Sequence, residues 1–209
     1  MTSPNSQIQR LIIGISGASG AVYGVRLLEL LRDTPIETHL VVSKSALITL
    51  AHETGLSWSQ IKAMSTVCYS SQDIGAAIAS GSFKTMGMIV APCSIRSMSE
   101  IASGVTSTLL TRAADVILKE RRRLVLMVRE TPLHRNHLRS MMELAELGAI
   151  IAPPVPAFYA KPTTLSEMVD HTLGRVLDMF DIELGIVRRW RDEPEAVPTL
   201  DEIETAIAG

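Results

Sequence analysis

Leu11-Ile-Ile-Gly-Ile-Ser-Gly-Ala-Ser-Gly-Ala-Val-Tyr-Gly24 is the stretch of sequence that decides the fold. Its apolar start, residues 11–15, predicts a buried strand, and the apolar pattern after the turn predicts an amphipathic helix. The small residues 16–20 between them place backbone N–H groups at the positive end of the helix dipole, which is a favourable site for an anion. We therefore expect a phosphate at this turn, with Ser16 and Ser19 as additional hydroxyl donors.

The turn differs from the two commonest phosphate motifs. A P-loop needs Gly-Lys-Ser/Thr after its second glycine, but Gly20 is followed by Ala21-Val22, which excludes a P-loop nucleoside triphosphatase. The dinucleotide fingerprint needs three glycines and an acidic residue after the second strand, whereas the strand predicted over Glu37–Val42 ends in Ser43-Lys44. These side chains suit another phosphate or a ring better than a ribose diol. A tight turn that binds nothing is the alternative.

The composition indicates one apolar domain. Of the 209 residues, 46% are hydrophobic and 20% charged, and the mean hydropathy is +0.24. No run reaches the ~18 apolar residues of a membrane span, so we expect a soluble homo-oligomer that buries apolar surface between subunits. The net charge of −2 gives no reason to expect nucleic acid. Two cysteines form no disulfide framework, and residues 1–10 lack the apolar core of a signal peptide, so we expect a cytoplasmic protein.

Apolar strands and helices alternate along the rest of the chain. Apolar strands separated by helices predict an α/β domain in which helices cover both faces of a parallel sheet. Further strands are predicted over Val67–Tyr69, Met86–Ala91 (ended by Pro92), Leu124–Val128 and Ala149–Ala152. Further helices are predicted over Ser45–Glu53 (with Ser45 as the N-cap), Ser59–Met64, Thr106–Arg122, Arg135–Leu147 and Ser166–Asp181.

The residues that follow each strand are the candidates for a ligand site, because ligands of such sheets bind beyond the carboxyl ends of the strands. They provide hydroxyls, cations and the carboxylate of Glu130, the obvious proton carrier. Several hydroxyls with fixed cations suit a phosphate ester. Taken singly, each serine is better explained as an N-cap and each arginine as a surface charge, but the five segments agree. They are Ser16–Gly20, Ser43-Lys44, Pro92–Ser97, Arg129–Pro132 and Pro153–Tyr159.

The histidines and cysteines predict neither a metal site nor a nucleophile. His134 and His137 are near Glu143 and Glu146 in sequence, but the four match no known ligand spacing, so we expect no metal. Cys93 has no histidine placed by sequence to activate it, and a buried thiol is expected there. Structural roles are expected for His39, His52 and His171.

A set of motifs together resembles the UbiX-like flavin prenyltransferases. The likeness runs in order from about Arg10 to Trp190, and the set is specific although each motif alone is weak. Arg123 departs from a proline common in relatives, and Ile95-Arg96-Ser97 varies a loop that often ends in threonine. The motifs are Gly14–Gly20 with Tyr23-Gly24, Val42-Ser-Lys44, Ala91-Pro-Cys-Ser94, Thr111–Arg121, Val128–Leu133 and Pro153–Tyr159.

The resemblance implies a three-layer, flavodoxin-like (Rossmann-like) sheet that binds FMN at the subunit boundaries of a homo-oligomer, typically a dodecamer. Such enzymes join the dimethylallyl group of dimethylallyl monophosphate to N5 and C6 of reduced FMN without a metal. The product, prenylated FMN, passes to a UbiD-like decarboxylase. Residues 10–187 would form the FMN-binding domain, residues 1–9 a disordered or extended N-terminus, and residues 188–209 a tail that contributes to the active site or to oligomer contacts.

The same resemblance assigns roles to individual positions. The catalytic groups would be Ser19, Glu53, Glu130 and Lys119. Contacts to FMN would come from Gly17, Ala18, Ser19, Ser43, Ser94, Ile95, Arg96, Ser97 and Arg129. The prenyl phosphate would be held by Lys119, Arg129, Tyr159 and Arg175, with Arg112 nearby and Trp190 beside the prenyl chain.

Those residue types fit the reaction. Fixed cations stabilise a departing phosphate without a metal. The aromatic face of Trp190 or of the flavin stabilises an allyl cation. Loss of the proton at C6 needs a base, which is Glu130 or the retained phosphate.

Three other functions are compatible with an FMN-binding fold. An FMN-dependent cysteine decarboxylase would carry Pro-Ala-Ser-Ala-Asn-Thr and Met-Asn-x-x-Met-Trp, where this chain has residues 92–97 and 129–133 of different sequence. A non-oxidative aromatic-acid decarboxylase would need a metal or electron-sink motif, and none is found. A non-catalytic flavin carrier needs one phosphate site, whereas this rim offers groups for two.

Overall fold

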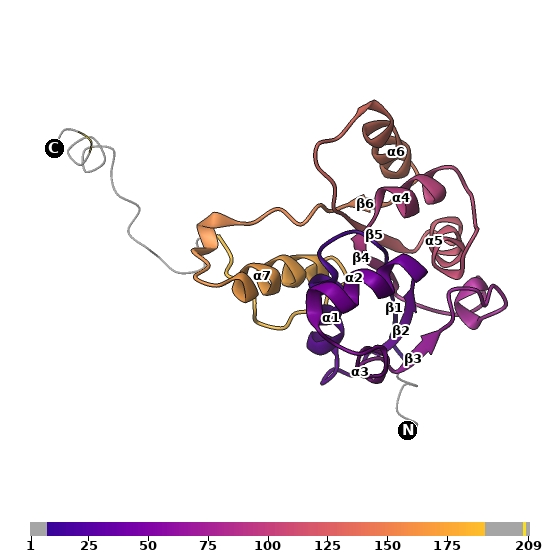
Figure 1. Ribbon diagram of the computed structural model, residues 1–209, viewed down its shortest axis with the longest axis horizontal. Coiled ribbons are helices and arrows are strands. Elements are labelled where there is room, and N and C mark those ends of the chain that lie inside the picture. Colours follow the sequence, from indigo (N-terminus) through magenta and orange to yellow (C-terminus); the bar gives the residue numbers. More distant parts are fainter. Residues whose placement is uncertain (1–7, 191–206, 208–209) are drawn as a thin grey trace, which may run out of the picture.

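The computed structural model describes residues 8–190 and residue 207, and its strands form one parallel sheet (Figure 1). The strand order is β3-β2-β1-β4-β5-β6. The order reverses between β1 and β4, and ligands of such sheets bind at this switch point. The strands are β1 (Arg10–Ile15), β2 (Glu37–Val42), β3 (Val67–Tyr69), β4 (Gly87–Cys93), β5 (Arg123–Val128) and β6 (Ile150–Ile151).

Helices cover both faces of the sheet and make three layers (Figure 1). One face packs against α1 (Ala21–Leu31), α2 (Lys44–Thr54), α3 (Trp58–Ala63) and α7 (Leu165–Asp178). The other packs against α4 (Ile95–Ala102), α5 (Leu109–Lys119), α6 (Arg135–Glu146) and the short 3₁₀ helix η1 (Ala77–Ala79). A second 3₁₀ helix, η2 (Phe158–Ala160), precedes α7. The predicted α/β fold with helices on both faces is confirmed.

The central strand β1 shows why the sequence forms this core. Leu11, Ile13 and Ile15 belong to the cluster with α1 and α7, whereas Ile12 belongs to the cluster with α4 and α5. Side chains of a strand alternate between the two faces, so a strand buried on both faces is apolar at every position. This is why an uninterrupted apolar run correctly predicted the strand.

Two predicted element boundaries are wrong at the edge where the strands end. β4 does not stop at Pro92 but continues to Cys93, with a register shift between Val90 and Cys93 in its pairing with β5. The residues that follow do not stay a loop, because Ser94 caps a helix, α4, that begins at Ile95. A proline interrupts strand pairing only locally at such an irregularity.

Two helix starts also need correction. Ser43, and not Ser45, is the N-cap of α2, since its hydroxyl accepts a hydrogen bond from the backbone N–H of Ala46. α5 begins at Leu109 rather than Thr106, because Thr108 and Thr111 form a reciprocal capping box.

The predicted terminal segments lie mostly outside the described residues. Of residues 1–9, residues 8 and 9 are described, and of the tail 188–209, residues 188–190 and 207. Within the described part of the chain, no helix combines the length and apolar composition needed to cross a membrane.

Candidate functional site

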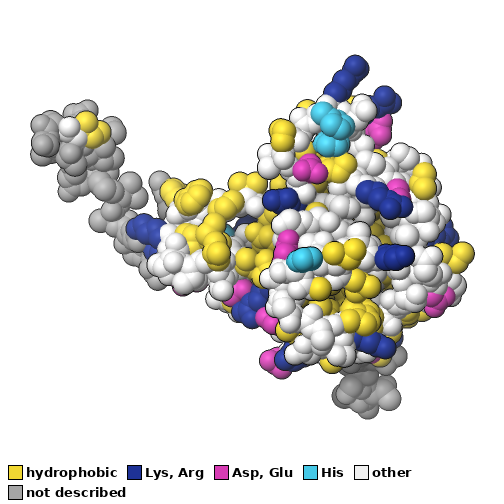
Figure 2. Space-filling view, in the orientation of Figure 1, with side chains coloured by type: hydrophobic (Ala, Val, Ile, Leu, Met, Phe, Trp, Pro, Cys, Tyr) yellow, Lys and Arg dark blue, Asp and Glu magenta, His cyan; other side chains and the backbone are white. Residues whose placement is uncertain are grey.

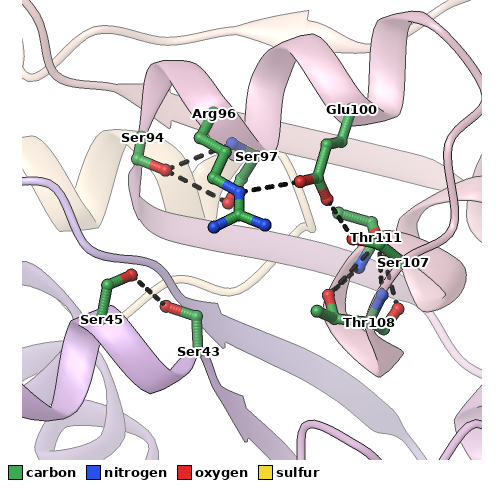
Figure 3. A network of polar contacts seen from close by, with 9 residues as sticks. All are labelled: Ser43, Ser45, Ser94, Arg96, Ser97, Glu100, Ser107, Thr108 and Thr111. Atoms are coloured by element: carbon green, nitrogen blue, oxygen red, sulfur yellow. Dashed lines mark hydrogen bonds and ion pairs between the residues drawn. The ribbon is translucent and has the colours of Figure 1, made fainter.

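Three helices begin around one cleft at the carboxyl edge of the sheet (Figure 3). Ser43, Ser94 and Thr108 are the N-caps of α2, α4 and α5, and each accepts a hydrogen bond from the backbone N–H three residues later. The cleft has a volume of about 410 Å³. Its lining residues are Ser43, Lys44, Ser45, Ile48, Ser71, Gln72, Ser94, Arg96, Ser97, Glu100, Thr108 and Leu110.

The chemistry of this cleft favours a phosphate. The hydroxyls of Ser43 and Ser45 lie 3.2 Å apart at the start of α2, and those of Ser94 and Ser97 lie 3.2 Å apart at the start of α4. The first N–H groups of a helix have no acceptor inside the helix, and the helix dipole is positive there. Two helix starts lined with hydroxyls therefore supply both donors and positive potential to a bound anion.

An ion pair borders the cleft. Arg96 Nε donates to Glu100 Oε1 over 2.9 Å, and Ser107 Oγ donates to Glu100 Oε2 over 2.6 Å. Burial would raise the pKa of Glu100, but the hydrogen bonds from Ser107 and Arg96 outweigh it and hold the pKa below its usual range. Of the described residues lining the cleft, Glu100 carries the single negative charge. The sequence prediction missed Glu100, although the i,i+4 spacing from Arg96 on a helix is a signal for such a pair.

The turn before α1, where a phosphate was predicted, contains an anion from the chain itself. The carboxylate of Glu53 on α2 accepts hydrogen bonds from the backbone N–H groups of Gly20 at 2.8 Å and Ala21 at 2.7 Å. Burial would raise the pKa of Glu53, but hydrogen bonds from Ser19, Ala21 and Gly20 and the charge of Arg129 lower it overall. A phosphate would have to displace this carboxylate, so the prediction of a phosphate here needs correction.

The predicted donor role of Ser16 also needs correction. Ser16 is fully buried; its hydroxyl donates to the backbone carbonyl of Pro92 at 2.9 Å and accepts from the backbone N–H of Ser94 at 2.7 Å. The backbone N–H of Arg129 in turn donates to the carbonyl of Cys93. Ser16 therefore ties β1 to the end of β4 and fixes the start of α4 instead of contacting a ligand.

Gly17 brings the turn into contact with the start of α2. A Cβ atom at Gly17 would overlap the side chain of Ser45, and Gly20 has a φ of 102°, which a side chain disfavours. The turn and the cleft are therefore adjacent. Gly17 thus touches Ser45, which lines the cleft, and Ser19 and Arg129 are near enough to Glu53 to lower its pKa, although none of these four residues lines the cleft itself.

The predicted proton carrier Glu130 directly follows Arg129 at the end of β5. It is exposed, and its Oε1 accepts a hydrogen bond from the backbone N–H of Thr131 at 3.0 Å. Its carboxylate is thus available at the rim of the sheet, where the sequence predicted a base.

A separate aromatic cluster surrounds the middle of α7. The ring of Tyr159 lies edge-on to His171 and to Trp190, with centroid distances of 5.6 and 5.5 Å. Arg175, one turn after His171, forms an ion pair with Asp178 at 2.7 Å. None of these residues lines the helix-start cleft of the same chain.

Lys119 lies at the opposite edge of the sheet. It is the last residue of α5, which runs from the carboxyl edge to the start of β5 at Arg123. Its Nζ pairs with Glu120 at 2.6 Å, and both side chains approach Gly81. Arg112, near the start of the same helix, pairs with Asp115. Within one chain, Lys119 does not join the other predicted catalytic residues.

Two histidines and a cysteine that the sequence singled out have structural surroundings. His134 caps α6 through its Nδ1, which accepts from Asn136 N–H, and its ring stacks on that of His137 at 3.4 Å. In the part of the chain that the structure describes, no group of three or more His, Cys, Asp or Glu residues is arranged to hold a metal. Cys93 is buried as predicted, and burial raises its pKa to about 12, which makes it a poor nucleophile.

A doubly wound parallel sheet with an anion cleft at its switch point defines a flavodoxin-like, phosphate-binding α/β protein. The family model for flavoproteins matches residues 1–190. The flavin prenyltransferase UbiX of Escherichia coli (strain K12) is 56% identical over 187 residues, which cover 88% of this chain and 99% of that protein. The chain therefore belongs to the UbiX-like flavin prenyltransferases within the flavoprotein family, and the resemblance seen in the motifs is confirmed.

Solved structures agree with this assignment. A UbiX crystal structure in complex with FMN and dimethylallyl pyrophosphate superimposes with a TM-score of 0.87 at 44% identity, covering 90% of this chain and all of that one. A dodecameric FMN-dependent UbiX-like decarboxylase from Escherichia coli O157:H7 superimposes with a TM-score of 0.86 at 46% identity, covering 88% of this chain and all of that one. By contrast, the FMN-dependent cysteine decarboxylase TvaF gives 0.57 at 16% identity, covering 70% and 90%, and shares the fold alone.

Proposed function

We propose that this chain joins the dimethylallyl group of dimethylallyl monophosphate to N5 and C6 of reduced FMN, giving prenylated FMN without a metal ion. One observation carries the proposal: at the carboxyl edge of the sheet, the helix-start cleft lies next to a second cluster of polar side chains. The helix-start cleft suits one phosphate. In the neighbouring cluster, Arg129 supplies a cation, and Ser19 and Glu53 supply proton-carrying groups. These would serve a second phosphate ester, the one that reacts. The similarity to UbiX enzymes supports the same function.

The residues present fit FMN. Its phosphate would occupy the cleft, held by the hydroxyls of Ser43 and Ser94, the first N–H groups of α4 and the guanidinium of Arg96. Gly17, Ala18 and Ser19 would contact the flavin next to this cleft, since the turn touches the start of α2. When bound in its reduced form, FMN would supply N5, which replaces the phosphate oxygen on the prenyl carbon, and C6, which exchanges its ring proton for a bond to the donor's carbon–carbon double bond while the other alkene carbon takes up a proton. The remaining FMN contacts would come from Ile95, Ser97 and Arg129.

The chain's own residues would then act on the donor. Arg129 stabilises the negative charge of the departing phosphate, which a fixed cation does without reorganisation. Glu130 accepts the proton lost from C6. Ser19 and Glu53, which lie close enough for Ser19 to lower the pKa of the Glu53 carboxyl, would orient the polar edge of the flavin. Cations replace a metal here, so we expect EDTA to leave the rate unchanged.

Completion of the donor site would require other subunits. Lys119 lies at the far edge of the sheet, and Arg112, Tyr159, Arg175 and Trp190 lie outside the cleft. If these residues bind the prenyl phosphate and chain, they do so from neighbouring copies in a homo-oligomer, which we propose to be a dodecamer. Mixed oligomers of Lys119→Ala and Arg129→Ala subunits should then recover part of the activity that each variant lacks alone, because some sites carry both native residues.

Product mass tests the function. The purified chain is incubated anaerobically with reduced FMN and dimethylallyl monophosphate, and the flavin is analysed by mass spectrometry. We expect a flavin heavier than FMN by one C5H8 unit, and no such product when the donor is omitted; a parallel reaction with the diphosphate donor measures donor preference. Recovery of unmodified FMN alone would identify a flavin carrier and would reject the proposal.

The fate of the product is part of the proposal. Prenylated FMN would serve as the cofactor of a UbiD-like decarboxylase. The cytoplasm is the proposed location, in agreement with the free thiols of Cys68 and Cys93. Adding the reaction mixture to a cofactor-free UbiD-like decarboxylase should generate activity, whereas FMN alone should not.

A further inference from the structure

The guanidinium of Arg96 is held on one side only. In the described part of the chain, its hydrogen bond from Nε to Glu100 Oε1 is its one polar side-chain contact, and its side chain is 81% exposed. In Figure 3 only Nε of Arg96 contacts Glu100, and the two terminal nitrogens point from the start of α4 toward the space bordered by Ser43, Ser45 and Thr108. The edge of the guanidinium that can bind a phosphate through two parallel hydrogen bonds is thus directed into the cleft.

Glu100 is itself fixed in place. Its second oxygen accepts the hydroxyl of Ser107, the residue before the N-cap of α5, and its side chain is 19% exposed. Glu100 thus connects α4 to the start of α5, two of the helices that surround the cleft (Figure 3). A carboxylate anchored in this way can restrict the rotamers of a long, exposed arginine before any ligand arrives.

Two opposite effects on a bound phosphate follow from this carboxylate. Its negative charge repels the phosphate, whereas its hold on Arg96 removes conformational freedom that the arginine would otherwise lose on binding. Repulsion would dominate if Glu100 faced the phosphate directly. In Figure 3 the guanidinium of Arg96 lies between the Glu100 carboxylate and the hydroxyl of Ser94, so a phosphate held at this hydroxyl would meet the cation first, and we expect the ordering of Arg96 to outweigh the repulsion.

We propose that Glu100 is a positioning residue that orients Arg96 toward the phosphate of FMN and thereby sets the preference of the site for FMN over riboflavin. The inference rests on the proposed function, because it places that phosphate in the helix-start cleft. Glu100 would thus influence which flavin binds without touching either the flavin or the prenyl donor.

Binding of two flavins tests the proposal. Dissociation constants for FMN and for riboflavin, which lacks the phosphate, are measured by quenching of flavin fluorescence for the wild type, Glu100→Ala, Glu100→Gln, Arg96→Ala and the double variant. We expect Glu100→Ala to weaken FMN binding about tenfold and to leave riboflavin binding unchanged. Glu100→Gln should lose less affinity for FMN than Glu100→Ala, because its amide oxygen can still accept the hydrogen bond from Arg96 Nε. In the Arg96→Ala background, removal of Glu100 should cause no further loss.

A matched control exists on α6. Arg139 Nε donates to Glu143 Oε1 at 2.8 Å with the same i,i+4 spacing, and neither residue lines the cleft. Glu143→Ala should therefore bind both flavins like the wild type. Thermal unfolding of each variant identifies losses caused by misfolding, for which Glu100→Gln serves as the milder substitution.

The remaining outcomes reject the proposal in distinguishable ways. Tighter FMN binding by Glu100→Ala would show that the carboxylate only repels the phosphate. Equal weakening of FMN and riboflavin binding would show a purely structural role. If Arg96→Ala leaves the ratio of the two dissociation constants unchanged, the phosphate lies elsewhere, and the placement of FMN in the proposed function fails together with this inference.

Discussion

Glu130 is the residue on which the proposed proton transfer depends. Glu130→Gln keeps the size of the side chain but removes its basicity, so FMN should bind as in the wild type. Formation of prenylated FMN should fall by about 10²- to 10⁴-fold, the usual contribution of a positioned base. Single-turnover product analysis by mass spectrometry measures this. An unchanged rate would show that Glu130 is not the base, and that the retained phosphate accepts the proton from C6.

Gly17 is the residue that allows the turn and the cleft to adjoin. Gly17→Ala places a methyl group on the side chain of Ser45, so the turn or α2 must shift, and we expect the purified protein to retain little FMN. Gly75→Ala is the control, because its added Cβ would meet only Asp73 Oδ1 at 3.6 Å. The flavin-to-protein absorbance ratio reports both variants. A Gly17→Ala protein with a full complement of FMN would contradict this account of the turn.

At the scale of elements, Glu53 on α2 caps the N-terminus of α1. Glu53→Gln removes the charge that accepts from Gly20 and Ala21. Because Glu53 is exposed and the glutamine amide oxygen can still accept, the loss should stay below the ~1 kcal/mol of a deleted helix cap. Because the folded pKa of Glu53 lies below that of an ordinary glutamate, about 4.3, this stabilisation is fully present above that pH and is lost as the pH falls through the folded pKa.

Thermal unfolding at a series of pH values checks this assignment. The melting temperature of the wild type should exceed that of Glu53→Gln near pH 6, and the difference should shrink as the solution becomes more acidic. A difference that stays constant down to about pH 3 would show that the lost stability does not come from the ionised carboxylate.

The elements also show which features the sequence could predict. An apolar run predicted β1 to within a residue, since burial on both faces requires apolar side chains at every position. β2 was also predicted with its observed bounds, although its first half carries Glu37, Thr38 and His39. α4 was missed because a helix of two turns has little periodicity and begins with a cap, Ser94, that equally suits a turn. The capping of α1 by Glu53 joins residues more than 30 positions apart, and no local pattern carries such a contact.

At the scale of the whole molecule, apolar side chains gather on the surface over η2 and the start of α7 (Figure 2). Phe158 is 75% exposed and Leu165 is 79% exposed. Surfaces of this kind mark protein interfaces. The proposed homo-oligomer would bury them, and it would also let Lys119 reach a site at the opposite edge of another chain's sheet.

Charged substitutions test this surface. Phe158→Asp and Leu165→Glu should lower the mass of the assembly measured by light scattering and should abolish prenyl transfer, because the donor site then lacks its contributions from other subunits. Ile74→Asp is the control, since Ile74 is 65% exposed but lies on a different segment, before η1. A fully active monomer would show that one chain contains the complete site.

A crystal structure of the chain with FMN and dimethylallyl monophosphate tests the central claim, two phosphates in two adjoining sites, most directly. We predict the FMN phosphorus among Ser43, Ser94 and Arg96, with Glu53 still capping α1. The donor phosphorus should lie beside Arg129. An FMN phosphate bound at the turn in place of the Glu53 carboxylate, or a donor phosphate without contact to Arg129, would contradict the account.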